Sequence, residues 1–158
     1  MTNKSAIFLL IIIIVVGGCS NMNTSDNYDK LFTNYLDMWN TGDFTNIETT
    51  ISEDFELKYV HSTESILGIN GFKEHITQTR KAYPNFTLTV EEHFNSSNVI
   101  AIRWSLNATQ FNDNGENQIR SNGISILHME EGILIDEWIA YDRLDWMEQL
   151  GYNLSKQE

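Results

Sequence analysis

The sequence is poor in cysteine, proline and basic residues. It has one cysteine, one proline and only 10 Lys and Arg against 22 Asp and Glu, so the formal net charge is −12. A lone cysteine excludes an intramolecular disulfide, and the fold must rely on its core. A single proline argues against a proline-rich linker. Without a cluster of Lys and Arg, the chain lacks the surface that nucleic-acid phosphates require.

The N-terminus combines a positive charge with a short apolar run. Lys4 precedes an unbroken run of 11 apolar residues, Ala6 to Val16. This run is too short to cross a bilayer, which takes about 20 residues, but it has the length of a signal-peptide core. Two glycines and then Cys19 follow, an arrangement that resembles the bacterial lipobox. The resemblance implies that residues 1–18 are a lipoprotein signal peptide and that Cys19 carries the lipid; the alternative is an uncleaved anchor with an incidental cysteine.

Lipidation would place the protein outside the cytoplasm, on a bacterial membrane. Ser20 stands where an Asp marks inner-membrane retention in some Gram-negative bacteria, so the outer membrane is expected if the cell has one. The acidic chain should be repelled by anionic headgroups, and attachment would then rest on the lipid alone. Residues 19–27 are predicted to form a polar tether, residues 28–152 a single domain and residues 153–158 a tail.

Hydrophobic periodicity predicts helices in the first half of the domain. Three segments have apolar residues at helical spacing: 28–41, 44–51 and 72–83. Pro84 ends the third, because proline does not continue a helix. Residues 55–61 lie between the second and third helices and alternate as a strand does, with Tyr59 and His61 on one face.

The second half of the domain alternates as β-strands do. Four such segments follow Pro84, and the Asn114-Gly115 pair marks a hairpin between two of them. The last strand begins at Ile133 and runs directly into a short C-terminal helix. A run of strands after a run of helices indicates an α+β fold, with helices on one face of an antiparallel sheet. Because the last strand is apolar on both faces, the other face is expected to pack against a second copy in a homodimer.

Asp142 stands where the last strand meets the C-terminal helix. In a strand, residues two apart share a face, so Asp142 follows Trp138 and Ala140 on one face, while Ile139 and Tyr141 lie on the other. An unpaired buried charge is costly, so Asp142 either reaches solvent or lies in a pocket. Three interpretations remain open. Asp142 caps the helix, it moves a proton on a ligand in an apolar pocket, or it anchors that ligand.

Other candidate residues are histidines and large aromatics. His61 is either the proton partner of Asp142 or a hydrogen-bonded residue at a cavity rim, and His128 is either a second catalytic residue or a core or interface residue. His75 and His93 have the pattern of surface positions. None of the four has metal-ligand spacing, so no metal is expected.

Large aromatics provide the candidate walls of a ligand cavity. Trp and Tyr suit such a wall because they bury much area and keep a polar atom, and they suit a core equally well. The candidates are Trp39, Tyr59, Phe72, Trp104 and Trp138, with Trp104 and Trp138 preferred as walls.

Four segments, taken in order, resemble the SnoaL-like branch of the nuclear transport factor 2 superfamily. They are residues 35–61, 68–92, 99–111 and 123–151, and the resemblance extends over about residues 30–151. It implies a cone in which helices wrap a curved antiparallel sheet and a hydrophobic cavity opens at one end. It also implies a homodimer, because many members are dimeric.

The same resemblance implies a chemistry. In the polyketide cyclases of this branch, a carboxylic acid on the last strand is the general acid/base of an aldol closure, and a histidine on the preceding strand accompanies it. Asp142 matches the first position and His128 falls near the second. The resemblance implies no cofactor. The resemblance therefore favours a lipid-anchored domain that holds a small hydrophobic ligand, with proton transfer of the polyketide or ester cyclase type as one hypothesis. A non-catalytic binding module and a structural module are the alternatives, because cyclase substrates are made in the cytoplasm.

Overall fold

The computed structural model describes residues 24–112, 115–153 and 155. The predicted signal peptide and Cys19 lie outside these residues. The α-helices are α1 (Thr24–Thr41), α2 (Gly68–Ala82) and α3 (Arg143–Gln149). The strands are β1 (Ile51–Tyr59), β2 (Ile66–Leu67), β3 (Thr87–Ser96), β4 (Val99–Asn112), β5 (Gly115–Glu130) and β6 (Ile133–Tyr141). This is the expected α+β fold.

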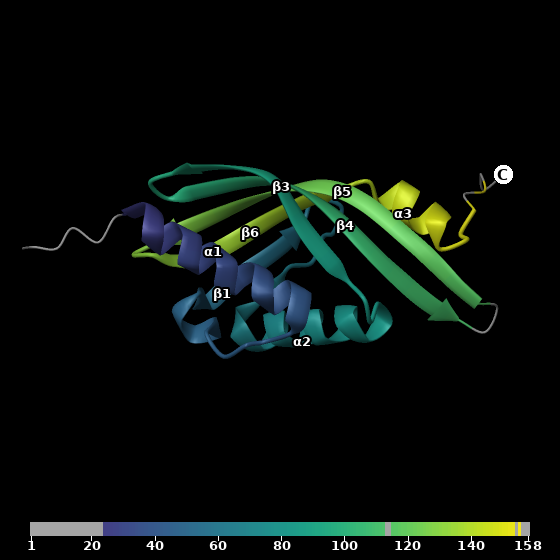
Figure 1. Ribbon diagram of the computed structural model, residues 1–158, viewed down its shortest axis with the longest axis horizontal. Helices are drawn as coiled ribbons and strands as arrows, with labels where there is room; N and C mark the ends of the chain where they lie inside the picture. The colour runs from purple at the N-terminus through teal and green to yellow at the C-terminus, as the bar shows by residue number, and fades with distance from the viewer. Residues whose placement is uncertain (1–23, 113–114, 154, 156–158) are drawn as a thin grey trace, which may run out of the picture.

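All six strands form one sheet in the order β2-β1-β6-β5-β4-β3. Neighbours are antiparallel except β1 and β6, which are parallel. Helices α1 and α2 lie on one face of the curved sheet, and α3 follows β6 beside β5 (Figure 1). The hairpin predicted between β4 and β5 is confirmed, because the two strands pair from Asn112 and Gly115 onward, and Asn114 itself lies outside the described residues.

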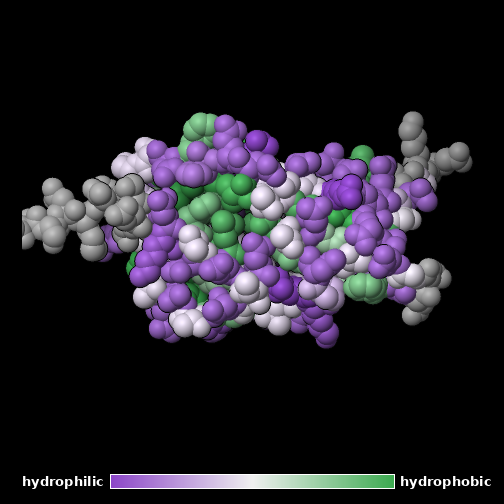
Figure 2. Space-filling model, viewed as in Figure 1, coloured by the Kyte–Doolittle hydropathy of each residue, from purple (hydrophilic) through white to green (hydrophobic). Residues whose placement is uncertain are grey.

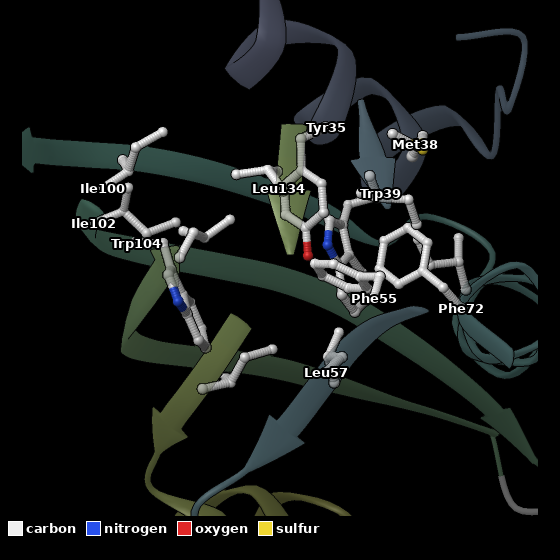
Figure 3. Close-up of a cluster of buried hydrophobic side chains, with 14 of the residues drawn as sticks. Tyr35, Met38, Trp39, Phe55, Leu57, Phe72, Ile100, Ile102, Trp104 and Leu134 are labelled. Atoms are coloured by element: carbon white, nitrogen blue, oxygen red, sulfur yellow. The ribbon is translucent and has the colours of Figure 1, made fainter. Parts of the chain in front are cut away.

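The core forms between the inner face of the sheet and the apolar stripe of α1. Alternate residues of β4 are buried, as their spacing predicts, and they are Ile100, Ile102, Trp104 and Leu106. Figure 3 shows aromatic rings from α1, β1 and α2 gathered in the same cluster. On the face shown in Figure 2, hydrophobic residues gather near the middle and hydrophilic residues surround them. Burial of this apolar surface provides the main free energy of folding.

Several boundaries differ from those predicted. Helix α2 begins at Gly68, four residues before the predicted start, and β1 ends at Tyr59 and not at His61. The helix predicted over residues 44–51 is a single 3₁₀ turn, Ile47–Thr49, and β1 begins at Ile51. This segment is rich in Thr and Ile, whose branched side chains are poor helix formers. Its last residue, Ile51, is the first residue of β1. Helix α1 begins at Thr24, inside the range assigned to the tether.

Two side-chain amides attach helices to strand backbones. Asn40, near the end of α1, donates to the Leu88 carbonyl at 3.0 Å and accepts from the Leu88 N–H at 2.7 Å. Gln149 of α3 makes the same pair of bonds to Arg120, at 2.8 and 2.7 Å. Each amide satisfies a donor and an acceptor of the sheet and holds the end of its helix against the sheet. Of the helices described, none is long and apolar enough to cross a membrane.

Candidate functional site

A cavity of about 630 Å³ lies between the sheet, the C-terminal ends of α1 and α2, and α3. Its volume falls within the range of roughly 300–1,000 Å³ typical of small-molecule sites. Most of its apolar wall is aromatic, and the rings belong to Trp39, Tyr59, Tyr83, Phe86, Trp104, Tyr141 and Trp146. The cone is therefore not filled by its own side chains, and a small ligand has room.

One carboxyl group, that of Glu137 on β6, lies in this aromatic wall. Glu137 is only 2% exposed. The Tyr35 hydroxyl donates to one of its oxygens, and the Ser125 hydroxyl is a second donor. Ser125 in turn accepts from the Trp104 ring N–H at 3.1 Å. Three neighbouring side chains thus fix the orientation of the carboxyl group.

Burial controls the protonation of Glu137. Desolvation raises the pKa of Glu137 from 4.5 to about 7, although the hydrogen bonds from Tyr35 and Ser125 act in the opposite direction. None of the ion pairs found among the described residues involves this carboxylate. Both protonation states are therefore populated near neutral pH, as a general acid/base requires.

A second polar pair lines the same cavity. The Tyr59 hydroxyl and His75 Nε2 are hydrogen-bonded at 2.8 Å, and the His75 ring meets the Trp39 ring edge-on. Burial lowers the pKa of His75, which favours the neutral imidazole, and burial also raises the pKa of Tyr59. The prediction that His75 is a surface residue is wrong, because it lies on the side of α2 that faces the cavity.

His61 lies at the rim of the cavity, between the aromatic rings and Arg143. The His61 ring stacks on Tyr59 at a centroid distance of 5.5 Å and meets Tyr141 edge-on at 5.0 Å. Desolvation lowers the pKa of His61, and the positive charge of Arg143 lowers it further. His61 is exposed and lines the cavity, which agrees with its interpretation as a rim residue.

Asp142 does not line the cavity. Its side chain is exposed, and it accepts a hydrogen bond from the Asp145 N–H at 3.0 Å. This is the geometry of a helix N-cap, and α3 begins at the next residue. The capping interpretation of Asp142 is thus confirmed, and the carboxyl group in the cavity is that of Glu137.

Three other candidates lie away from the cavity. Trp138 is on the outer face of the sheet and 51% exposed, so the prediction that it forms a cavity wall is wrong. His128 is also on the outer face, where it pairs with Asp136 at 2.6 Å. Phe72 is fully buried against Tyr35, Trp39 and Phe55 in the core, and it is not a wall residue.

The other candidates, Trp39, Tyr59 and Trp104, do line the cavity, and so does His61. Gly123 makes room for Trp104, because a β-carbon on Gly123 would lie 2.2 Å from the Trp104 ring. Glu137 and His75 were missed. The signal for Glu137 was present, since an acid two residues before Ile139 shares the apolar face of Ile139 and Tyr141.

Comparison with known proteins assigns the fold to a family. The profile of the SnoaL-like polyketide cyclases matches residues 29–150. The chain belongs to this family. No curated protein matches it. Within the described part of the chain, no group of three or more His, Cys, Asp or Glu residues could hold a metal ion.

Solved structures of similar fold include several SnoaL-like proteins. A putative polyketide cyclase from Bacillus cereus ATCC 10987 is 26% identical, with a TM-score of 0.68, and the match covers 79% of this chain and 80% of that one. A putative SnoaL-like polyketide cyclase from Shewanella denitrificans OS-217 is 12% identical, with a TM-score of 0.69 and coverage of 78% and 96%. A protein with a ketosteroid isomerase-like fold from Catenulispora acidiphila, in complex with trimethylamine, is 10% identical, with a TM-score of 0.68 and coverage of 78% and 94%.

Proposed function

We propose that the cavity binds a small, largely apolar molecule and that Glu137 transfers a proton on it, as in a cyclase or isomerase. The observation that carries this proposal is a buried carboxyl group with no cationic partner among the described residues, in a ligand-sized aromatic cavity. Such a group is costly to bury without a cation, although it accepts hydrogen bonds from the Tyr35 and Ser125 hydroxyls. Membership of the SnoaL-like polyketide cyclase family supports the same reaction class.

The substrate that suits this site has an acidic C–H bond on the carbon next to a carbonyl group. In its ionised form Glu137 accepts the proton, and Tyr35 and Ser125 keep the carboxylate in place. The Tyr59 hydroxyl, which is hydrogen-bonded to His75 and lines the same cavity, is the candidate donor of a hydrogen bond to the developing enolate oxygen. Protonated Glu137 then returns the proton at another carbon.

A non-catalytic binding module is the second candidate. Two hydroxyl groups already donate to Glu137, and these bonds favour its ionised form and reduce its strength as a base. The size of the cavity argues against a purely structural role, because a structural cone would be filled.

Hydrogen exchange of an enolisable ketone separates the two candidates. The purified protein is expected to accelerate deuterium exchange at the α-carbon of 2-tetralone, followed by proton NMR in D₂O. The rate should rise with pH through a midpoint near 7, where Glu137 ionises. Glu137→Gln should lower the protein-catalysed rate by about 10²-fold or more, as is typical when a general base is lost.

Asp142→Asn is the matched control, because it removes an exposed carboxylate from the residue after the same strand. Its rate should equal that of the wild-type protein. Exchange that is insensitive to Glu137→Gln, or that falls equally in Asp142→Asn, would contradict catalysis by Glu137. Binding of 2-tetralone without acceleration would instead favour the binding module.

The proposal also places this domain at a bacterial membrane, through a lipid on Cys19. Support comes from the sequence alone, namely the apolar run that ends at two glycines and Cys19. Cells that express the full chain should incorporate radioactive palmitate into it, and Cys19→Ser should abolish the label. Equal labelling of the wild-type protein and Cys19→Ser would refute lipidation at this cysteine.

The proposal further includes a homodimer formed through the outer face of the sheet. Ile124, Ile126 and Trp138, here called the outer patch, are 53%, 40% and 51% exposed, and Ile126 lies opposite Trp138 across neighbouring strands. Lys58 lies over the Trp138 ring and Asp136 borders it, so charges of both signs flank the patch. A two-fold axis can bring such charges opposite one another, and a second copy therefore suits this patch.

A further inference from the structure

We infer that the cavity is selective for ligands that carry an anionic group, of the carboxylate class, and that Arg143 binds this group. The inference rests on the proposal that the cavity is the ligand site. It does not depend on proton transfer by Glu137.

Arg143 is the only Lys or Arg among the described residues that line the cavity. The ion pairs found in the described part of the chain join Arg103 to Glu92 and His128 to Asp136, and neither involves Arg143. The chain has 22 acidic and only 10 basic residues. Arg143 nevertheless has no carboxylate partner among the described residues, and its guanidinium can donate two hydrogen bonds to a bound carboxylate in a bidentate geometry.

The surroundings of Arg143 also suit an anion. Ser62 and Thr63 line the cavity next to His61 in the chain. The Ser62 hydroxyl already donates to the Glu64 carbonyl at 2.9 Å, so Thr63 is the hydroxyl donor that this segment offers to an anion. Burial raises the pKa of Tyr141, and the positive charge of Arg143 opposes that rise. The same charge lowers the pKa of His61. The positive charge of Arg143 is therefore felt by His61 and Tyr141, which both line the cavity. An anion bound beside them would neutralise this charge.

Charge also determines which end of the ligand lies deep. Glu137 is the only acidic residue among the described lining residues, and it lies buried between Tyr35 and Ser125. Its carboxylate would repel an anion at that position, whereas exposed Arg143 attracts one. An amphipathic acid would therefore bind with its charge at Arg143 and its apolar body along the Trp104, Tyr141 and Trp146 rings.

The test compares 2-naphthoate with 2-naphthamide, which have nearly the same shape but differ in charge. Equilibrium dialysis of the purified full-length protein at pH 8 should show naphthoate bound about tenfold more tightly, the effect expected for one partly screened charge-assisted contact. Raising the salt concentration from 50 to 500 mM should reduce this preference. Naphthoate bound no more tightly than naphthamide would overturn the inference.

Variants attribute the preference to one residue. Arg143→Gln should lose the preference for naphthoate while keeping its affinity for naphthamide, which also reports that the cavity is folded. Arg103→Gln is the matched control, because Arg103 is exposed and paired to Glu92 at 3.4 Å, and it should keep the preference. If Arg143→Gln binds neither probe, Arg143→Lys should restore both affinities and the preference. Failure of that restoration, or a preference that persists in Arg143→Gln, would overturn the inference.

Glu137→Gln separates this inference from the proposed function. It should keep the preference for naphthoate, because the carboxyl at Glu137 does not bind the anion, even as it loses proton transfer. Loss of the preference in Glu137→Gln would overturn the assignment to Arg143. Retention of the preference in a protein that never catalyses exchange would leave Arg143 supported and the catalytic proposal refuted.

Discussion

Relative to Glu137→Gln, the wild-type protein is expected to lose about 3 kcal/mol of unfolding free energy as the pH rises from 4.5 to about 7. Burial raises the pKa of Glu137, so in this window the folded protein holds a proton that the unfolded chain has already released. Raising the pH therefore favours unfolding. The stabilising effect of the raised pKa is complete below pH 4.5 and is lost by about pH 7.

Urea unfolding at a series of pH values measures this effect. The other carboxylates titrate in both proteins, so the difference between wild type and Glu137→Gln isolates the contribution of Glu137. Gln has nearly the shape of Glu and can still accept from the Tyr35 hydroxyl. Asp142→Asn serves as the control and should show the same loss of unfolding free energy relative to Glu137→Gln as the wild type does. If the unfolding free energies of wild type and Glu137→Gln change with pH in the same way, Glu137 has an ordinary pKa in the folded protein and the prediction is wrong.

Trp138→Asp is expected to raise the dissociation constant of the proposed homodimer by at least about 100-fold. Trp138 is at the centre of the outer patch, between Lys58 and Ile126. Aromatic residues at the centre of an interface commonly contribute 2 kcal/mol or more. An Asp there would also place an additional carboxylate in an apolar contact, which is costly. The domain itself should remain folded, because Trp138 is half exposed in the single chain.

Sedimentation equilibrium over a range of protein concentrations, in one detergent for all samples, measures this effect. Phe111→Asp is the matched control, because Phe111 is an aromatic residue that is 61% exposed near the end of β4, outside the patch. It should leave the dissociation constant unchanged. A wild-type protein that is monomeric at every concentration, or a Phe111→Asp variant that dissociates equally, would contradict an interface at the outer patch.

Glu137 and Asp142 show that the local sequence pattern does not identify which acid lies in the cavity. Both acids lie among apolar residues at spacing two in the same stretch, and either fits a pattern in which one acid closes an apolar face. Alternation separates their faces but does not say which face turns inward. That choice depends on which side of the sheet α1 and α2 cover. The helices cover the side of Glu137, and Asp142 caps the helix that follows.

His75 and Trp138 were misplaced for the same reason. His75 lies on an amphipathic helix beside polar residues, and the sequence does not show that this part of α2 faces a cavity rather than solvent. Trp138 has the size and apolar character of a wall residue, but it lies on the uncovered face of the sheet. Hydrophobicity predicts burial against some partner, and it does not identify that partner.

Apart from the 3₁₀ turn at Ile47–Thr49 and the short strand β2, the order of helices and strands was determined by the sequence itself, as were the β4–β5 hairpin and the helix after Asp142. Periodicity, turn residues and caps act over a few neighbouring residues. The SnoaL-like segments likewise identified the family. Only the tertiary structure decided which side of each strand faces the cavity, and hence that Glu137, His75 and Arg143 share one space. Those three residues lie on a strand and two helices, and packing between these elements brings them together.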